Sequence, residues 1–178
     1  MLKKFLKRIP QEKENNEDEG SDEEEGNDAQ ERFMLALESE VAKVESFFRS
    51  ALAEKLSDFR SLCKRVNKLH LDEKVTDEFL GFEQLIALLD GSKEAELLKD
   101  FVAFSEEVDA VRSFVMTNAQ AAVKITKKHD KLTKGLRLRE QYVSVLHRCT
   151  FYNSRDFGAL IADIEVLATQ LIEKLTGR

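Results

Sequence analysis

Apolar residues recur at intervals of three and four along residues 29 to 69, as they do on one side of an amphipathic helix. The positions that form this stripe are Leu37, Val41, Val44, Phe48, Leu52, Leu56, Phe59, Leu62, Val66 and Leu69. Because residues three and four apart share one face of an α-helix, the pattern predicts one long helix over about residues 29 to 69.

Two further helices are predicted between residues 76 and 117. Thr76 or Asp77 can open a short amphipathic segment, and Asp90-Gly91 can end it, because glycine is favoured just beyond a helix. Ser92 can then cap a longer helix. The apolar positions of that helix are Leu97, Leu98, Phe101, Val102, Phe104, Val108, Val111 and Val115.

The C-terminal third of the chain predicts several shorter helices. Thr117-Asn118 are cap-type residues inside a continuing pattern, and they predict a kink or restart. The pattern then reaches about Lys131, breaks at Thr133 to Gly135, resumes from Leu138 to Cys149, and restarts after Asn153-Ser154 for a last helix ending near Thr176. The chain as a whole is therefore predicted to hold six or seven helices without an internal repeat.

Composition narrows the fold class. A fold of many short strands needs many turns, and turns favour Gly and Pro. This chain of 178 residues has one Pro, 7 Gly and 35% charged residues, which is too few turn-forming residues for such a fold. We therefore expect one all-α domain. Its longest apolar runs fall far short of the roughly 18 residues of a membrane span, and its start lacks the apolar region of a secretory signal. These features predict a cytoplasmic or nuclear protein, with Cys63 and Cys149 as reduced packing residues.

The net charge of −6 is unevenly distributed. Residues 1 to 10 carry a charge of +4 and residues 11 to 28 carry −9, which leaves −1 for the rest of the chain. The acidic stretch has no aromatic or aliphatic side chain with which to offset the entropy of ordering it. We expect residues 10–28 to form a disordered acidic linker and residues 29–178 to form the helical bundle.

Candidate chemistry is sparse. The three histidines, His70, His129 and His147, show no spacing typical of a metal site, and the sequence has neither a Gly-rich phosphate loop nor a nucleophile motif. We therefore expect a protein that is not an enzyme and that needs no metal or cofactor.

The exception is a run of lysines in residues 124 to 131. At 100° per residue, Lys124, Lys127, Lys128 and Lys131 share an arc of about 100° on one helix, and Asp130 lies outside that arc. Such a cluster is either a solvated face or a site for an anion, and flexible lysines suit clustered phosphates. Nucleic acid is a weaker candidate because the chain is acidic, with a pI of about 5.3.

Several of these segments resemble the SPX domain family. The run NAQAAVKITKKHDK, from Asn118 to Lys131, is similar to the family's lysine-bearing helix, and Phe33 to Phe48 resembles an earlier helix. The start, MLKKFLK, resembles the end of the family's second helix. The family opens with a first helix and a tyrosine-bearing half of the second, and this sequence begins after both, so the resemblance implies that residues 1–9 are the remnant of an N-terminal helical hairpin. Together with the helical periods, it implies an elongated helical bundle with two long antiparallel helices, an N-terminal helix fragment and shorter C-terminal helices.

The resemblance implies a function. SPX domains sense phosphate status by binding inositol polyphosphates or pyrophosphates, here through Lys124, Lys127, Lys128 and Lys131 with Lys3 and Lys4. Partners of stand-alone members include transcription factors of the phosphate-starvation response, and no direct contact with nucleic acid is implied. Without the family's tyrosine we expect affinity weaker by about ten-fold or more than that of a complete domain. The alternative is a helical scaffold or coiled-coil adaptor that binds no ligand.

Overall fold

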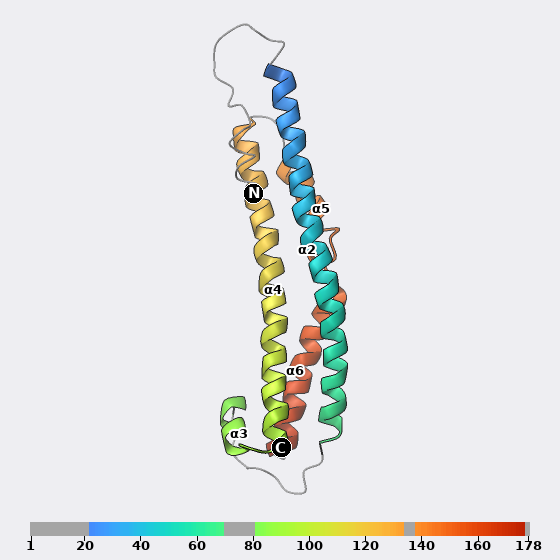
Figure 1. Ribbon diagram of the computed structural model, residues 1–178, viewed down its shortest axis with the longest axis vertical. Helices are drawn as coiled ribbons and strands as arrows, with labels where there is room; N and C mark the ends of the chain where they lie inside the picture. The colour runs from blue at the N-terminus through green and yellow to red at the C-terminus, as the bar shows by residue number, and fades with distance from the viewer. Residues whose placement is uncertain (1–21, 70–80, 134–137, 177–178) are drawn as a thin grey trace. The chain divides into compact units, whose positions relative to one another are not determined.

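The computed structural model describes residues 22–69, 81–133 and 138–176, which form helices and no strand. The described helices are α2 (Asp22–Asn67), α3 (Phe82–Leu88), α4 (Lys93–Leu132), α5 (Leu138–Leu146) and α6 (Arg155–Thr176) (Figure 1). This confirms the all-α helical fold predicted from the sequence. Among these helices, none combines the length and the apolar character that crossing a lipid bilayer requires.

The chain folds into two compact units. The first unit comprises the chain up to Arg49 and residues Phe114–Asn153, so it holds the start of α2, the end of α4, and α5. The second unit comprises Ser50–Ser113 and the chain from Ser154 onward, with α3, α6 and the remaining parts of α2 and α4.

In the first unit α2 packs antiparallel to α4. Phe33 stacks on His129 with ring centroids 4.8 Å apart, and Phe47 packs on Phe114 at 4.5 Å, so residue numbers rise along one helix as they fall along the other. The apolar core comprises Phe33, Leu37, Val44, Phe48, Val115, Ala119, Ala122, Ile125, Leu138, Tyr142, Leu146 and Phe151. Every α2 residue among these except Phe33 belongs to the stripe that the sequence pattern predicted.

In the second unit the same two helices are again antiparallel. Phe59 stacks on Phe104 at 6.0 Å, and Arg65 Nη1 lies 2.6 Å from Asp100 Oδ2. A buried cluster of Leu85, Leu98 and Leu175 joins α3, α4 and α6. The short α3 therefore depends on tertiary packing, because a helix of seven residues is too short to be stable alone.

Two predicted N-caps are present. The Ser92 hydroxyl accepts a hydrogen bond from the backbone N–H of Ala95 at 3.0 Å, and the Ser154 hydroxyl accepts one from Phe157 at 3.1 Å. Each bond satisfies an N–H that the first turn of a helix cannot pair internally. The predicted starts of α4 and α6 are therefore confirmed.

Two boundaries differ from the sequence prediction. The restart predicted at Thr117-Asn118 is wrong, because α4 is continuous and the Asn118 amide donates to the carbonyl of Phe114 at 2.8 Å within the same helix. Helix α2 begins at Asp22, whereas a start near residue 29 was expected. Acidic residues are favourable in a first turn because they complement the positive end of the helix dipole. Residues 1–21, which include the predicted N-terminal fragment and most of the linker, lie outside the described residues.

Two glycines give opposite expectations for stability. Gly91, in the turn between α3 and α4, has φ of 79°, and a Cβ there would meet no atom but would strain the backbone. Gly91→Ala should therefore lower the free energy of unfolding by about 1 kcal/mol. Gly158 lies inside α6 with open space around it, so Gly158→Ala should raise the same quantity by about 0.5–1 kcal/mol. Urea unfolding of both variants checks the pair, and equal effects of the same sign would contradict it.

Candidate anion-binding site on helix α4

The segment from Lys124 to Lys131 has two different faces within α4. Ile125, Thr126 and His129 are buried and face the core of the first unit. The four lysines, Lys124, Lys127, Lys128 and Lys131, are exposed. We call these four residues the lysine cluster. The division follows from the helical period, since the buried and exposed positions alternate at the three- and four-residue spacing of one turn.

No ion pair to the lysine cluster occurs in the part of the chain that the structure describes. Other cations of the first unit do have partners, for example Arg32 with Asp28 at 2.6 Å and Arg49 with Glu45 at 2.8 Å. Lys3 and Lys4, which the family resemblance placed at the same site, lie outside the described residues. The cluster thus exposes four ammonium groups without a described counter-charge.

The single acidic residue of the segment is used elsewhere. The two carboxylate oxygens of Asp130 accept hydrogen bonds from the backbone N–H groups of Leu138 and Arg139, each at 3.0 Å. Asp130 therefore caps the first turn of α5, where the helix dipole favours a negative charge. The sequence predicted that Asp130 lies away from the lysines, but it gave no sign of this cap, because donor and acceptor are eight and nine residues apart.

The Asp130 cap also brings Arg139 to the vicinity of the lysine-bearing segment. A surface cavity of about 310 Å³ is lined by Asp130, Arg139, Glu140 and Val143. The Arg139 residue is exposed and starts α5, so it is a further cation that an anion could reach. The sequence analysis did not assign Arg139, because its place beside Asp130 depends on how α5 folds back.

The inner face of the segment is held uncharged. His129 is fully buried, stacks on Phe33, and has no hydrogen-bond partner for Nε2 in the described structure. Burial lowers the pKa of His129, although Asp130, whose Oδ1 lies 3.6 Å from Nδ1, acts in the opposite direction. A neutral imidazole adds no charge to the lysines on the opposite face.

This buried histidine predicts a loss of stability in acid. An unfolded chain takes up the His129 proton near the ordinary pKa of 6.5, whereas the folded chain does so only at lower pH. Between the two pKa values the unfolded state binds more protons, so its share grows as pH falls. Urea midpoints should therefore drop between pH 7.5 and 5.5, and His129→Gln should show a smaller drop than wild type. The exposed His147→Gln serves as the control, and an equal pH dependence in wild type and His129→Gln would contradict the assignment.

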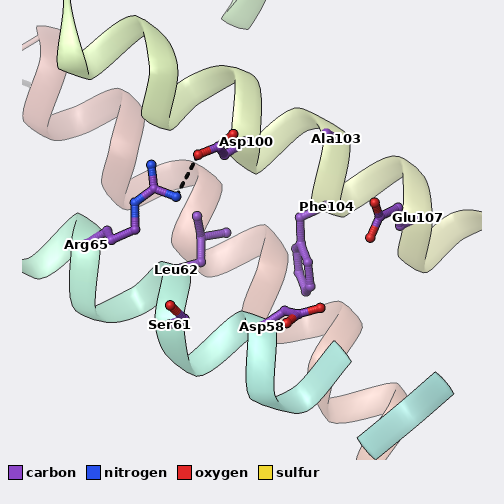
Figure 2. A pocket seen from close by; sticks show the side chains of 8 residues that line it. All are labelled: Asp58, Ser61, Leu62, Arg65, Asp100, Ala103, Phe104 and Glu107. Atoms are coloured by element: carbon purple, nitrogen blue, oxygen red, sulfur yellow. Dashed lines mark ion pairs between the residues drawn. The ribbon is translucent and has the colours of Figure 1, made fainter. Parts of the chain in front are cut away.

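The second unit holds a cavity of a different kind. It has a volume of about 310 Å³ and is lined by Asp58, Ser61, Leu62, Arg65, Asp100, Ala103, Phe104 and Glu107. Figure 2 shows the Arg65 guanidinium turned toward Asp100, to which it is ion-paired. Three of the eight lining residues are acidic and the one cation is paired, so this cavity is a poor site for an anion.

Lys55 beside that cavity shows what a paired lysine looks like in this chain. Its side chain is nearly buried, and its Nζ donates to Glu107 at 2.5 Å and to Asp58 and Glu54 at 3.2 Å each. The hydrogen bond to Glu107 is the main cause of its raised pKa, against the opposing effect of burial. The four exposed lysines of the lysine cluster have no such carboxylate partners among the residues that the structure describes.

The described residues offer little for metal-binding or thiol chemistry. Within residues whose side chains are described, no three His, Cys, Asp or Glu side chains are arranged to hold a metal ion. Cys63 and Cys149 are free thiols, and burial raises the pKa of each. A raised pKa makes a thiol less reactive, which agrees with their prediction as packing residues.

Comparison with known proteins finds similarity to a larger protein. No family model matches the chain. The chain is 25% identical over 152 residues to the xenotropic and polytropic retrovirus receptor 1 homolog of Danio rerio. The similarity covers 81% of this chain and 22% of that protein, so the chain spans less than a quarter of the length of the relative.

Proposed function

We propose that the chain is a phosphate-status sensing and signalling module that binds inositol polyphosphates or pyrophosphates and regulates a partner protein. The observation that carries the proposal is the lysine cluster, four exposed ammonium groups on one helix with no ion pair among the described residues. Lys3 and Lys4 would complete the site. The proposal includes no catalysis and no cofactor.

Electrostatics favours a ligand with several phosphates. Like charges three and four residues apart on a helix repel one another by a few tenths of a kcal/mol per pair, and a polyanion relieves this repulsion. The dipole of a helix stabilises cations in its last turn, which in α4 contains Lys131. Lys124, Lys127 and Lys128 lie before that turn, so the dipole does not account for them. Several lysines can share one clustered ligand because each carries a point charge on a flexible stem.

The family resemblance supports the same class of ligands. The resemblance of Asn118 to Lys131 to the SPX lysine motif implies inositol polyphosphates and inositol pyrophosphates as the ligands. We infer that the module acts in the cytoplasm or nucleus in the response to phosphate starvation, and that a transcription factor of that response is a candidate partner.

The proposed mechanism is electrostatic bridging. A bound polyphosphate neutralises the lysine cluster and draws Lys3 and Lys4 toward it, which links the start of the chain to α4. Ligand binding therefore changes the surface that a partner meets. Because the exposed charges are screened by salt, affinity should fall as ionic strength rises.

Calorimetric titration tests the proposal. Inositol hexakisphosphate and an inositol pyrophosphate are expected to release heat and bind at one site, more weakly at 0.5 M salt than at 0.05 M. Inorganic sulfate is the control, because it carries charge without clustered phosphates. No binding, or equal affinity for sulfate, would refute the proposal. Sedimentation with and without ligand separates the alternative scaffold, whose self-association would not respond to polyphosphate.

A further inference from the structure

A second surface of the first unit is an apolar groove between α4 and the loop after α5. It has a volume of about 590 Å³, and its α4 side runs from Val115 to Lys124. Val115, Ala119 and Phe151 are buried beneath it, whereas Met116 and Tyr152 at its rim are 55% and 46% exposed. Exposed apolar side chains beside a ready cavity are typical of a site that binds another molecule.

The wall of the groove is held from α2. The Glu45 carboxylate accepts hydrogen bonds from the backbone N–H groups of Thr150 and Phe151, at 3.3 and 3.2 Å, and from the Thr150 hydroxyl. Burial alone would raise the pKa of Glu45, but these bonds and that of Arg49 lower it overall. The His147 ring meets Tyr152 edge-on at 4.8 Å. A wall fixed in this way loses little freedom when a partner binds.

The groove and the lysine cluster lie on the same side of α4. At 100° per residue the groove residues from Val115 to Lys124 span about 180°, and Lys127 and Lys131 fall within that arc further along the helix. Asp130 also lies within the arc, but its two carboxylate oxygens are bonded to the backbone N–H groups that start α5. The combined surface is about 24 Å long at 1.5 Å per residue. It is apolar in its first half, and in its second half three lysines outnumber the one carboxylate, that of Asp130. No residue lining the groove is acidic, among those the structure describes.

The geometry points to an amphipathic helix of a partner protein as the occupant, with apolar anchors in the groove and a cluster of Asp or Glu against Lys127 and Lys131. A helix of about 16 residues matches the length of this surface, and spacing of i, i+4 and i+7 would place its anchors on one side. This deepens the proposed function by naming the chemistry of the partner, and it rests on that function in using the same lysines. Polyphosphate should therefore compete with the acidic end.

Two other occupants fit the surface less well. Residues 1–9 carry apolar side chains, but Lys3, Lys4, Lys7 and Arg8 would meet like charges at the lysine cluster when no phosphate is bound. A second copy would have to bring an acidic helix face next to an apolar one. Both occupants can be separated from the proposed one by experiment.

The test uses the full chain and a labelled 18-residue synthetic peptide. The peptide has leucines at i, i+4 and i+7 in one half and four glutamates in the other, and a scrambled peptide of equal composition is the control. Fluorescence anisotropy measured without polyphosphate should show that the full chain binds the designed peptide. The Met116→Asp substitution should weaken this binding at least ten-fold. Val166→Asp is the matched control, because Val166 is 56% exposed on α6 in the second unit and its replacement should change nothing.

Several outcomes would overturn the inference. The first is that the scrambled peptide binds as tightly as the designed peptide. The second is that the Met116→Asp variant binds the designed peptide as tightly as wild type does. The third is that inositol hexakisphosphate binds the chain but leaves its affinity for the peptide unchanged. Ten-fold tighter peptide binding after deletion of residues 1–9 would assign the groove to the chain's own start. A dimer that Met116→Asp dissociates would assign it to a second copy. If the chain binds the designed peptide but no polyphosphate, the groove is supported as a peptide-binding site and the proposed function is refuted.

Discussion

Replacing Lys127, Lys128 and Lys131 together with alanine is expected to weaken binding of inositol hexakisphosphate by about a hundred-fold or more. A hydrogen bond to a charged group contributes about 1.5–3 kcal/mol, and about 2.7 kcal/mol corresponds to a hundred-fold change in dissociation constant. Losing three neighbouring ammonium groups should exceed that value even if their effects are far from additive. Calorimetric titration of the variant and of wild type measures the difference.

The control must remove the same charge elsewhere. Lys64, Lys68 and Lys93 are exposed residues of the second unit, and replacing them with alanine changes the net charge equally. If the lysine cluster is a local site, this control should lower affinity by less than about three-fold, because distant exposed charges are screened within roughly 10 Å. A loss as large as that of the cluster variant would mean that ligand responds to net charge alone. Both variants should keep the wild-type unfolding midpoint, since all six side chains are exposed.

Much of the fold could be predicted because it depends on interactions between residues close together in the sequence. The helical period gave the core positions of α2, and the serines at 92 and 154 gave the starts of two helices because an N-cap hydroxyl acts over only three residues. That the lysine cluster shares one face could be predicted from the 100° rotation per residue of an α-helix alone. The restart predicted at Asn118 was wrong because a cap-type amide can also bond to the carbonyl four residues earlier and leave the helix intact.

The rest of the candidate site depends on contacts distant in sequence. Asp130 caps a helix that begins eight residues later, and Glu45 holds a loop more than 100 residues further along the chain. Neither bond has a spacing that a local rule recognises. Phe151 and Tyr152 form one wall of the apolar groove, and Glu45 bonds to the adjoining Thr150 and to the backbone of Phe151, so no pattern within α4 alone could have predicted the groove.

Replacing Phe33 with alanine is expected to lower the free energy of unfolding by about 3–5 kcal/mol. The ring is fully buried and stacks on His129, and removing a large buried aromatic side chain loses both its transfer energy and its contacts with the surrounding core. Phe33→Leu, which refills most of the space, should cost less than half as much. Urea unfolding at pH 7.5, where His129 is neutral in both states, measures the change.

Phe47→Ala is the matched control on the same helix. Phe47 is 46% exposed and packs on Phe114, so its loss should cost below about 1.5 kcal/mol. A similar cost for Phe33 and Phe47 would contradict the buried stack. The same comparison tests the link between core and site, because water reaching His129 in Phe33→Ala weakens the desolvation that lowers its pKa. The acid-dependent loss of stability should therefore shrink in Phe33→Ala and persist in Phe47→Ala, while the lysine cluster, on the opposite face of α4, keeps its affinity for polyphosphate in the molecules that remain folded.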